Sequence, residues 1–182
     1  MTAITSRQKR RLHDFYPTPA WATQELLARV PQISGTILEC CSGDGAIASV
    51  LSSQCQVVTN DIDVYRNSDL HFDAADQKQW IDGDYDWIIT NPPFSSAPSI
   101  VPLAYSRALV GIAFVLRLSY LEPCKDRIEW LLKHPVTQLI VLPRISFTSD
   151  GKKDQVTCAW FLWIKGSKEQ SIEIIPRRYN DK

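Results

Sequence analysis

The sequence predicts an α/β fold in which seven strands form one mostly parallel sheet with an antiparallel hairpin at its C-terminal end. Three observations lead to this prediction. Short apolar and β-branched runs alternate with helical spacings along the chain. Glycines follow the first of these runs, and acids follow the second and third, as in sheets that bind nucleotides. Near the C-terminus, two strong apolar runs flank a polar loop that contains glycine, which is typical of a hairpin.

Each element follows from a local pattern. The predicted strands are rich in apolar and β-branched residues and span 36–41, 56–59, 70–76, 85–90, 111–118, 136–142 and 155–164. The predicted helices have apolar residues at helical spacing and span 20–30, 46–52, 98–109 and 122–133. Prolines at 31 and 135 end the first and last helices, and Ser95 with Ser96 is a candidate cap for the third. Residues 172–175 are a candidate edge strand.

Composition indicates one soluble globular domain. The chain has 182 residues, of which 45% are apolar and 22% charged. No apolar run approaches the roughly 18 residues of a membrane span, and the N-terminus lacks a signal-peptide core. The five scattered cysteines have no CxxC spacing, so we expect neither a disulfide framework nor a zinc site. These features favour a cytoplasmic protein without a membrane partner.

Charge is distributed unevenly although the net charge is zero. Residues 1–13 carry four bases and no acid, and residues 39–91 carry ten acids against two bases. Residues 92–182 carry thirteen bases against eight acids. We therefore expect a basic arm (1–13), a single domain (14–175) and a polar tail (176–182). An acidic centre between basic ends fits a protein in which one half binds a cofactor and the other half faces a polyanion. The alternative is that the charges are unevenly spread over a solvated surface by chance.

Residues 86–94, Asp-Trp-Ile-Ile-Thr-Asn-Pro-Pro-Phe, form the most informative stretch. Proline biases the residue before it toward extended geometry, so Asn91 should lie at the carboxyl end of a buried strand. Open α/β sheets bind ligands at that edge. An amide, a backbone carbonyl and the aromatic Phe94 on a stiff loop suit a planar amine. The alternative is a strand that ends in a proline-rich turn without a function.

The preceding strands end in residues suited to a nucleoside. Gly43 and Gly45 permit a tight turn and close backbone approach before a helix. Asp61 ends the second strand, 22 residues after Glu39, where an acid binds a ribose diol. Asp73 ends the third strand and could accept a hydrogen bond from an adenine amine, or cap a helix.

Along the chain, the Pro-rich aromatic segment 14–19 is followed by the glycine turn, the two acids and the Asn-Pro-Pro-Phe loop. With its motifs in this order, the chain resembles the class I S-adenosylmethionine-dependent methyltransferases. Within them the chain looks most like small phage or bacterial DNA methyltransferases that act on adenine N6. The resemblance covers residues 14–164, and Asn91-Pro92-Pro93-Phe94 is its most specific motif. It implies a Rossmann-like class I methyltransferase fold with helices on both faces of the sheet, and S-adenosylmethionine as the cofactor.

The resemblance also implies site residues. Those matching the cofactor-binding motifs are Tyr16, Thr18 and Pro19 at the methionine end, Glu39, Cys41, Gly43 and Gly45 in the first loop, Asp61 at the ribose, and Asp73 with Ala74 at the adenine. Those matching the catalytic target-amine loop are Asn91, Pro92, Pro93 and Phe94. Cys40-Cys41 departs from the residues more usual in the first loop.

The chemistry of an adenine amine agrees with this loop. The amine is a poor nucleophile because its lone pair is delocalised into the ring. The Asn91 side-chain oxygen and the Pro92 carbonyl would accept both amine protons and favour a more tetrahedral nitrogen aimed at the sulfonium methyl. Phe94 would stack on a base flipped out of its helix.

The chain has no room for the target-recognition domain of larger DNA enzymes. We therefore expect little or short sequence specificity, or specificity supplied by a partner protein. Candidate phosphate contacts are Arg10, Arg11, Lys152 and Lys153. DNA is favoured over RNA as the substrate. Two different functions stay open beside these: methylation of a glutamine amide of release factors, whose enzymes carry tyrosine in the last motif position, and the role of a non-catalytic cofactor-binding partner subunit.

Overall fold

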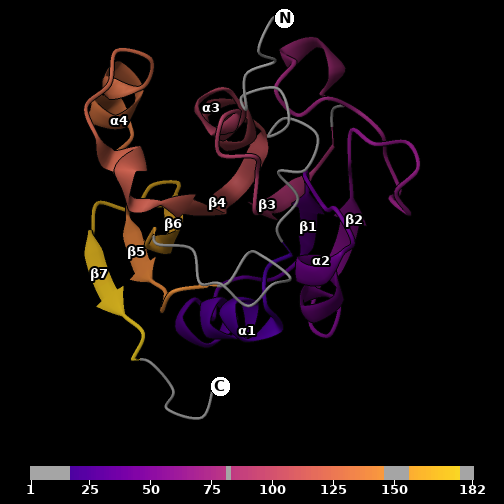
Figure 1. The fold of residues 1–182 in the computed structure, drawn as a ribbon, viewed down its shortest axis with the longest axis horizontal. Helices are drawn as coiled ribbons and strands as arrows, with labels where there is room; N and C mark the ends of the chain where they lie inside the picture. Colours follow the sequence, from indigo (N-terminus) through magenta and orange to yellow (C-terminus); the bar gives the residue numbers. More distant parts are fainter. Residues whose placement is uncertain (1–16, 81–82, 146–155, 177–182) are drawn as a thin grey trace, which may run out of the picture.

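Seven strands form one sheet, in which their spatial order is β2-β1-β3-β4-β6-β5-β7 (Figure 1). The computed structural model describes residues 17–80, 83–145 and 156–176. The strands are β1 (Thr36–Glu39), β2 (Gln56–Thr59), β3 (Tyr85–Thr90), β4 (Ala108–Arg117), β5 (Gln138–Val141), β6 (Cys158–Ile164) and β7 (Ser171–Ile174). The α-helices are α1 (Ala20–Arg29), α2 (Ala46–Leu51), α3 (Ala97–Arg107) and α4 (Ile128–Lys133).

Strand directions confirm the mostly parallel sheet with an antiparallel hairpin. β6 runs antiparallel to both of its neighbours, β4 and β5. The other recorded pairs of strands are parallel. The segment that joins β5 to β6 lies mostly outside the described residues.

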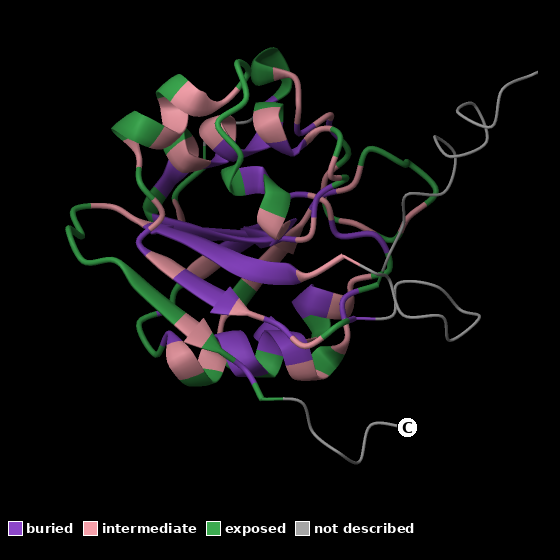
Figure 2. Cartoon of the chain, turned by 60° about the vertical axis from the view of Figure 1, so that its left-hand side comes forward, coloured by how far each residue is buried: buried purple, intermediate pink, exposed green. Residues whose placement is uncertain are grey.

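Helices cover both faces of the sheet, as predicted (Figure 1). On one face, Leu26 of α1 and Leu51 of α2 share a buried cluster with Trp87 and Trp160. On the other face, α3 packs against Ile88, Phe114 and Phe161, and Trp130 of α4 joins the edge of that cluster. The strands between the helices are largely buried (Figure 2), so they are apolar on both faces rather than alternating.

The strand order places a switch point between β1 and β3. The chain moves from β1 to β2 on one side and then returns to place β3 on the other side of β1. At such a point the connections leave the two carboxyl ends in opposite directions and open a crevice there. Asp86 fixes the opposite end of this pair, because its Oδ2 accepts a 2.8 Å hydrogen bond from the Thr36 backbone N–H.

The predicted third strand (70–76) is reduced to a single parallel bridge between Asn60 and Leu70. The reason is the side chain of Asn60, which is completely buried. Its Oδ1 accepts from the Phe72 N–H at 2.8 Å and its Nδ2 donates to the Phe72 carbonyl at 3.1 Å. These bonds satisfy the backbone of Phe72 as a neighbouring strand would, so the segment packs on the sheet without extending as a strand.

The last predicted helix (122–133) is shorter than expected. A 3₁₀ turn spans Leu118–Leu121, and α4 begins only at Ile128. The apolar spacing of this segment predicts that Ile128, Leu131 and Leu132 face inward, and this is wrong for Leu132, which is 76% exposed. Pro123 lacks a backbone N–H, and Arg127 donates to the carbonyls of Ser119 and Glu122, which supports the irregular turn.

Two smaller predictions, the edge strand at 172–175 and the serine cap, can also be compared with the structure. β7 lies at the edge of the sheet, next to β5, as expected for 172–175. α3 starts after Ser96, but no side-chain cap bond forms there. Trp160 is a packing residue, and its indole N–H donates to the Ala22 carbonyl at 2.8 Å. Among the described residues, no helix is long and apolar enough to cross a membrane.

Candidate active site

A cavity of about 490 Å³ opens where β1, β2 and β3 end. Its volume lies within the range of roughly 300–1,000 Å³ that is typical of ligand sites. Most of the predicted site residues line it: Thr18, Glu39, Cys41, Gly43, Asp61, Asp73, Ala74, Asn91, Pro92, Pro93 and Phe94. The carboxyl edge of the sheet therefore brings residues from 18 to 94 into one hollow.

Two predicted residues, Pro19 and Gly45, do not line the cavity. Pro19 directly precedes α1, and Gly45 directly precedes α2 with φ of 74°. Gly43 also has a positive φ, 54°, which residues other than glycine adopt at a cost. Tyr16 and the predicted phosphate contacts Arg10, Arg11, Lys152 and Lys153 lie outside the described residues.

Glu39 connects the end of β1 to the start of α2. Its side chain is 1% exposed, and its Oε2 accepts a 2.8 Å hydrogen bond from the Ala48 N–H. Burial raises the pKa of this carboxyl well above its usual value, and the nearby Asp61 raises it further, whereas the bond from Ala48 lowers it. Glu39 thus provides a hydrogen-bond acceptor for a backbone N–H in the first turn of α2. The residue also forms part of the cavity wall.

Replacing Glu39 with glutamine is expected to make the ligand-free protein relatively more stable as the pH rises. A carboxyl whose folded pKa is raised contributes stability below its unfolded pKa, and this contribution is lost as the pH rises through the folded pKa. The difference in unfolding free energy, variant minus wild type, should grow by up to about 1.4 kcal/mol per pH unit in that window. Urea denaturation between pH 4 and pH 9, roughly the span of documented buried carboxyls, measures it. A difference that does not change with pH would contradict the raised pKa.

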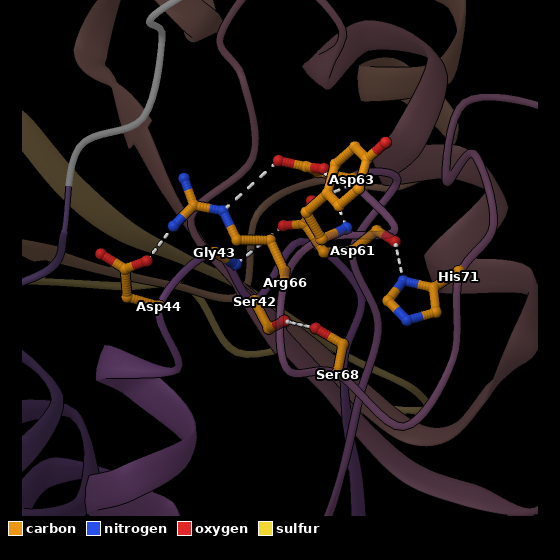
Figure 3. A network of polar contacts seen from close by, with 9 residues as sticks. Ser42, Gly43, Asp44, Asp61, Asp63, Arg66, Ser68 and His71 are labelled. Atoms are coloured by element: carbon orange, nitrogen blue, oxygen red, sulfur yellow. Dashed lines mark hydrogen bonds and ion pairs between the residues drawn. The ribbon is translucent and has the colours of Figure 1, made fainter.

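Asp61 ties the glycine turn to the loop after β2 (Figure 3). Its Oδ2 accepts from the Gly43 N–H at 2.8 Å, and its Oδ1 accepts from the Asp63 N–H at 2.9 Å. A carboxylate has about four acceptor sites, so two remain for a ligand. The two backbone bonds hold the carboxylate at the cavity wall, where a ribose diol could meet both oxygens.

Arg66 joins the two loops at the same place (Figure 3). Its guanidinium pairs with Asp44 in the glycine turn and lies 3.7 Å from Asp63 Oδ2. Ser42 and Ser68 add a 2.9 Å hydroxyl–hydroxyl bond between the same two loops. Because these contacts cross from the end of β1 to the loop after β2, they close one side of the cavity.

Asp73 lies in a turn that Asn60 and Trp80 hold in place. Its Oδ1 accepts from the Ala75 N–H at 2.9 Å. The Trp80 indole N–H donates to the Ala74 carbonyl at 2.9 Å, and its ring packs against Phe72 with centroids 5.4 Å apart. Asn60 also donates to the Cys40 carbonyl at 2.8 Å, which joins this turn to β1.

Asn91 lies directly after β3 and faces residues from the start of the described chain. Its Nδ2 donates to the Thr18 hydroxyl oxygen at 3.1 Å. The preceding Thr90 is completely buried, and its hydroxyl accepts from the Cys41 N–H at 3.2 Å. The backbone that carries Asn91 is thereby fixed to the loop after β1.

The ring of Phe94 makes a cation–π contact with an arginine side chain. The guanidinium carbon of Arg117, the last residue of β4, lies 4.6 Å from the ring centroid. Phe94 is half-buried, lines the cavity and packs against the cluster beneath α1. The contact with Arg117 restricts the orientation of this ring at the side of the cavity nearest β4.

The cavity is acidic overall. Four carboxyl groups and one guanidinium are among its lining residues: Glu39, Asp61, Asp63, Asp73 and Arg66. This excess of acids favours a ligand that carries positive charge and hydroxyl or amine donors. An uncharged amide, Asn91, faces the other end of the same cavity.

Three polar residues that shape this cavity were not predicted as site residues. Asn60 carries a sequence signal, because an amide at the end of an apolar strand, directly before an acid, must find partners when it is buried. Arg66 and Ser68 carry no such signal. They lie in a loop whose partners, Asp44 and Ser42, are more than 20 residues away, so only the fold shows the contacts.

No family model matches the chain, and no curated protein matches it by sequence. Solved structures do match its fold. A modification subunit assigned to a type I restriction enzyme from Vibrio vulnificus superposes with a TM-score of 0.64 at 12% identity, over 97% of this chain. The chain spans only 51% of that subunit's length.

Two further structures match over most of both chains. A protein from Pyrococcus horikoshii assigned as an RNA methyltransferase has a TM-score of 0.63 and 15% identity, with 82% of this chain and 85% of that chain covered. Magnesium protoporphyrin IX methyltransferase from Synechocystis was crystallised with S-adenosylmethionine. It has a TM-score of 0.53 and 12% identity, with 90% of this chain and 85% of that chain covered. The fold is thus the Rossmann-like fold of the class I methyltransferases.

Proposed function

We propose that this protein is an S-adenosylmethionine-dependent methyltransferase that acts on the N6 amine of adenine in DNA. The observation that carries the proposal is the position of Asn91. It follows β3 at the switch point, shares one cavity with Asp61 and Asp73, and precedes two prolines and an aromatic ring. The residues proposed to bind the amine and those proposed to bind the nucleoside thus line one hollow.

The residues of the cavity fit S-adenosylmethionine. Asp61 would accept from the ribose hydroxyls, and Asp73 with the Ala74 N–H would bind the adenine edge. The excess of carboxyl groups suits a ligand with a sulfonium and an ammonium group. Gly43 has no side chain, so the turn backbone can approach the ligand closely, and its positive φ favours glycine at this position. When bound, the cofactor supplies an electrophilic methyl group on sulfur.

The residues of this chain would prepare the amine for that methyl group. The Asn91 Oδ1 and the Pro92 carbonyl accept the two amine protons, which directs the nitrogen lone pair out of the plane of the ring. Phe94 stacks on the base and keeps it in this orientation. Catalysis here is mainly orientation, which can supply about 7–11 kcal/mol in well-aligned systems. The methylated amine would carry an extra proton and release it to water, so no general base of this chain is required in the step.

Charge on the target side supports a nucleic acid as the substrate. Arg117 is the last residue of β4, and the exposed Arg144 lies three residues after the end of β5. These two strands lie on either side of β6. Two strand spacings, about 10 Å, separate the ends of β4 and β5. The fold likeness to a modification subunit of a restriction enzyme agrees with DNA. Arg10, Arg11, Lys152 and Lys153 remain our proposed phosphate contacts. We propose that a partner protein supplies sequence recognition.

A tritiated-methyl transfer assay tests the proposal. The protein is offered duplex DNA, single-stranded DNA, RNA and release-factor protein in parallel, with labelled cofactor. We expect label in DNA, recovered as N6-methyladenine after digestion to nucleosides. Label in RNA alone would replace DNA with RNA as the substrate. Binding of cofactor without transfer to any polymer would favour a non-catalytic partner subunit.

Replacing Arg117 with methionine is expected to raise the KM for DNA about 3- to 30-fold and to leave the Kd of the cofactor unchanged. The variant keeps an apolar stem over Phe94 but loses a cation–π contact worth about 0.5–2 kcal/mol, so the ring stacks less firmly on the base. Steady-state kinetics with varied DNA, and calorimetry with the cofactor, provide the measurements.

Lys165 provides a matched control for this variant. Its ammonium lies 5.3 Å from the Tyr105 ring centroid, and its backbone N–H donates to the Val110 carbonyl near the start of β4, at the opposite edge of the sheet. Lys165→Met should therefore leave the KM for DNA unchanged. Equal KM effects of the two substitutions would show that loss of surface charge, rather than the Phe94 contact, is the cause.

A further inference from the structure

We infer that Glu39 is a specificity-determining residue, which holds a proton in the ligand-free protein and releases it to water when a positively charged ligand binds. Glu39 is the last residue of β1 and lines the cavity. A neutral ligand would leave the proton in place, so the residue would select ligands by charge. The inference rests on the proposed function, because it takes S-adenosylmethionine as the charged ligand.

The surroundings of Glu39 stabilise an ionised carboxyl poorly. The residue is 1% exposed, so water solvates its charge little. Among the described residues, one donor reaches the carboxyl, the Ala48 N–H at 2.8 Å. A carboxylate has about four acceptor sites, and roughly two or three backbone bonds hold its pKa very low. One bond therefore does not replace the lost solvation, and the neutral form of Glu39 is favoured.

Other acids face Glu39 across the cavity. Burial raises the pKa of Glu39 well above its usual value, and the nearby Asp61, in the loop after β2, raises it further. Asp63 and Asp73 add two more carboxyls to the lining. Glu39 differs from these three acids because it is buried, whereas solvent reaches each of them. It is therefore the carboxyl of this cavity that gains most from holding a proton.

The remaining groups around Glu39 do not offset these acids. The guanidinium of Arg66 is already paired with Asp44 in the glycine turn. The next residues after Glu39 are Cys40 and Cys41, and burial raises the pKa of the Cys40 thiol, so that this thiol stays neutral. The other segments that meet the cavity, α2, residues 17–24 and residues 90–92, carry no titratable side chain.

A positively charged ligand would reverse this balance. S-adenosylmethionine carries a sulfonium and an ammonium group, and an opposite charge within roughly 4–6 Å favours the ionised form of a carboxyl. In a wall of low dielectric constant such attraction is stronger than in water. The pKa of Glu39 would then fall toward its usual value, and the carboxyl would pass its proton to water. Affinity for the charged ligand therefore rises with pH until Glu39 is ionised before binding.

Calorimetry on the whole protein counts the released protons. Binding of S-adenosylmethionine is measured between about pH 5 and pH 8 in buffers with different enthalpies of ionisation, because the difference in heat reports the protons exchanged. We expect the wild type to release up to about one proton more than Glu39→Gln. The glutamine keeps an oxygen for the Ala48 N–H but has no proton to lose. Comparing the two proteins cancels protons from the ligand's own amino group, whose pKa is about 8.

Two controls separate charge from binding. Asp63→Asn removes a cavity carboxyl that is exposed, and it should release as many protons as the wild type. Adenosine lacks both cationic groups, and its binding to the wild type should release close to no proton. Equal release with adenosine and with S-adenosylmethionine would show that charge is not the cause and would overturn the inference.

Affinities provide a second readout. The Kd of S-adenosylmethionine for Glu39→Gln, divided by the Kd for the wild type, should rise by up to about tenfold per pH unit. The same ratio for adenosine should stay within about threefold at every pH. A ratio for S-adenosylmethionine that does not change with pH, or equal proton release by the two proteins, would show that Glu39 is not the source. No binding of S-adenosylmethionine at millimolar concentration would overturn both the inference and the proposed function.

A ¹³C titration of the ligand-free protein decides the protonation state directly. The Glu39 carboxyl signal is assigned by its loss in Glu39→Gln. We expect this signal to titrate within the same pH range and to shift to its ionised position when S-adenosylmethionine is added. A carboxyl that is already ionised at about pH 5 would overturn the inference and leave the proposed function intact. Proton release on binding without methyl transfer to any polymer would do the reverse.

Discussion

Replacing Asn91 with alanine is expected to lower kcat for methyl transfer at least about 100-fold, while the Kd of S-adenosylmethionine stays within about threefold. The substitution removes one of the two acceptors proposed for the amine protons and leaves the Pro92 carbonyl. Loss of one preoriented hydrogen-bonding group that acts in the transition state costs about 100- to 1,000-fold in comparable sites. The acids that would bind the cofactor lie at the other end of the cavity, so its affinity is spared.

Single-turnover kinetics with saturating cofactor measure this rate, and calorimetry measures the Kd. Asn67→Ala is the matched control, because Asn67 is exposed and does not line the cavity. A variant at position 91 that keeps full activity would show that the catalytic assignment is wrong. A joint loss of rate and cofactor affinity would place Asn91 in the cofactor site instead.

Replacing Asp61 with asparagine is expected to raise the Kd of S-adenosylmethionine about 10- to 100-fold. The amide keeps the volume and one oxygen for the Gly43 N–H, but it turns an acceptor for the ribose into a donor and removes the charge. Hydrogen bonds to charged groups are worth about 1.5–3 kcal/mol, which corresponds to this range of affinity. At saturating cofactor, kcat should stay within about threefold of the wild type.

Asp69 supplies the control for Asp61. Its Oδ2 accepts from the Thr59 N–H at 2.8 Å and from the Thr59 hydroxyl at 2.7 Å, and these bonds lower the pKa of the carboxyl. It thus makes backbone contacts like those of Asp61 but does not line the cavity. Asp69→Asn should lower the melting temperature and leave the Kd unchanged. Equal effects of both variants on the Kd would mean that Asp61 acts through the loop and not on the ribose.

Local patterns predict most of the fold because the strands are short apolar runs bounded by glycine, proline or acids. The first two strands and the first helix fall within one or two residues of their predicted bounds. Where prediction fails, a contact distant in sequence decides the structure. The segment 70–76 has the composition of a strand, but the Asn60 side chain takes the hydrogen bonds of Phe72. Leu132 has helical spacing, but α4 covers the sheet mainly through Trp130 and Leu131.

The site is predictable where chemistry is tied to the end of a strand. Asp61 and Asn91 each follow an apolar run, and parallel strands bring their carboxyl ends to one edge. Their roles stay predictions, as do those of the phosphate contacts. Contacts between side chains on separate elements are a different matter. No pattern links Thr18 to Asn91 or Arg117 to Phe94, because these bonds depend on how α1 and β4 pack against the sheet.

The pairing of β1 with β3 has a consequence for how the substrate range of such a protein can change. Ile37 and Leu38 pair with Trp87 and Ile88, so the glycine turn and Asn91 emerge from adjacent strands about 4.8 Å apart. The distance between the proposed methyl donor and acceptor is thus a property of the backbone ladder, independent of surface loops. Insertions between β5 and β6, or before Thr18, could deliver a different polymer while the reacting atoms keep their spacing.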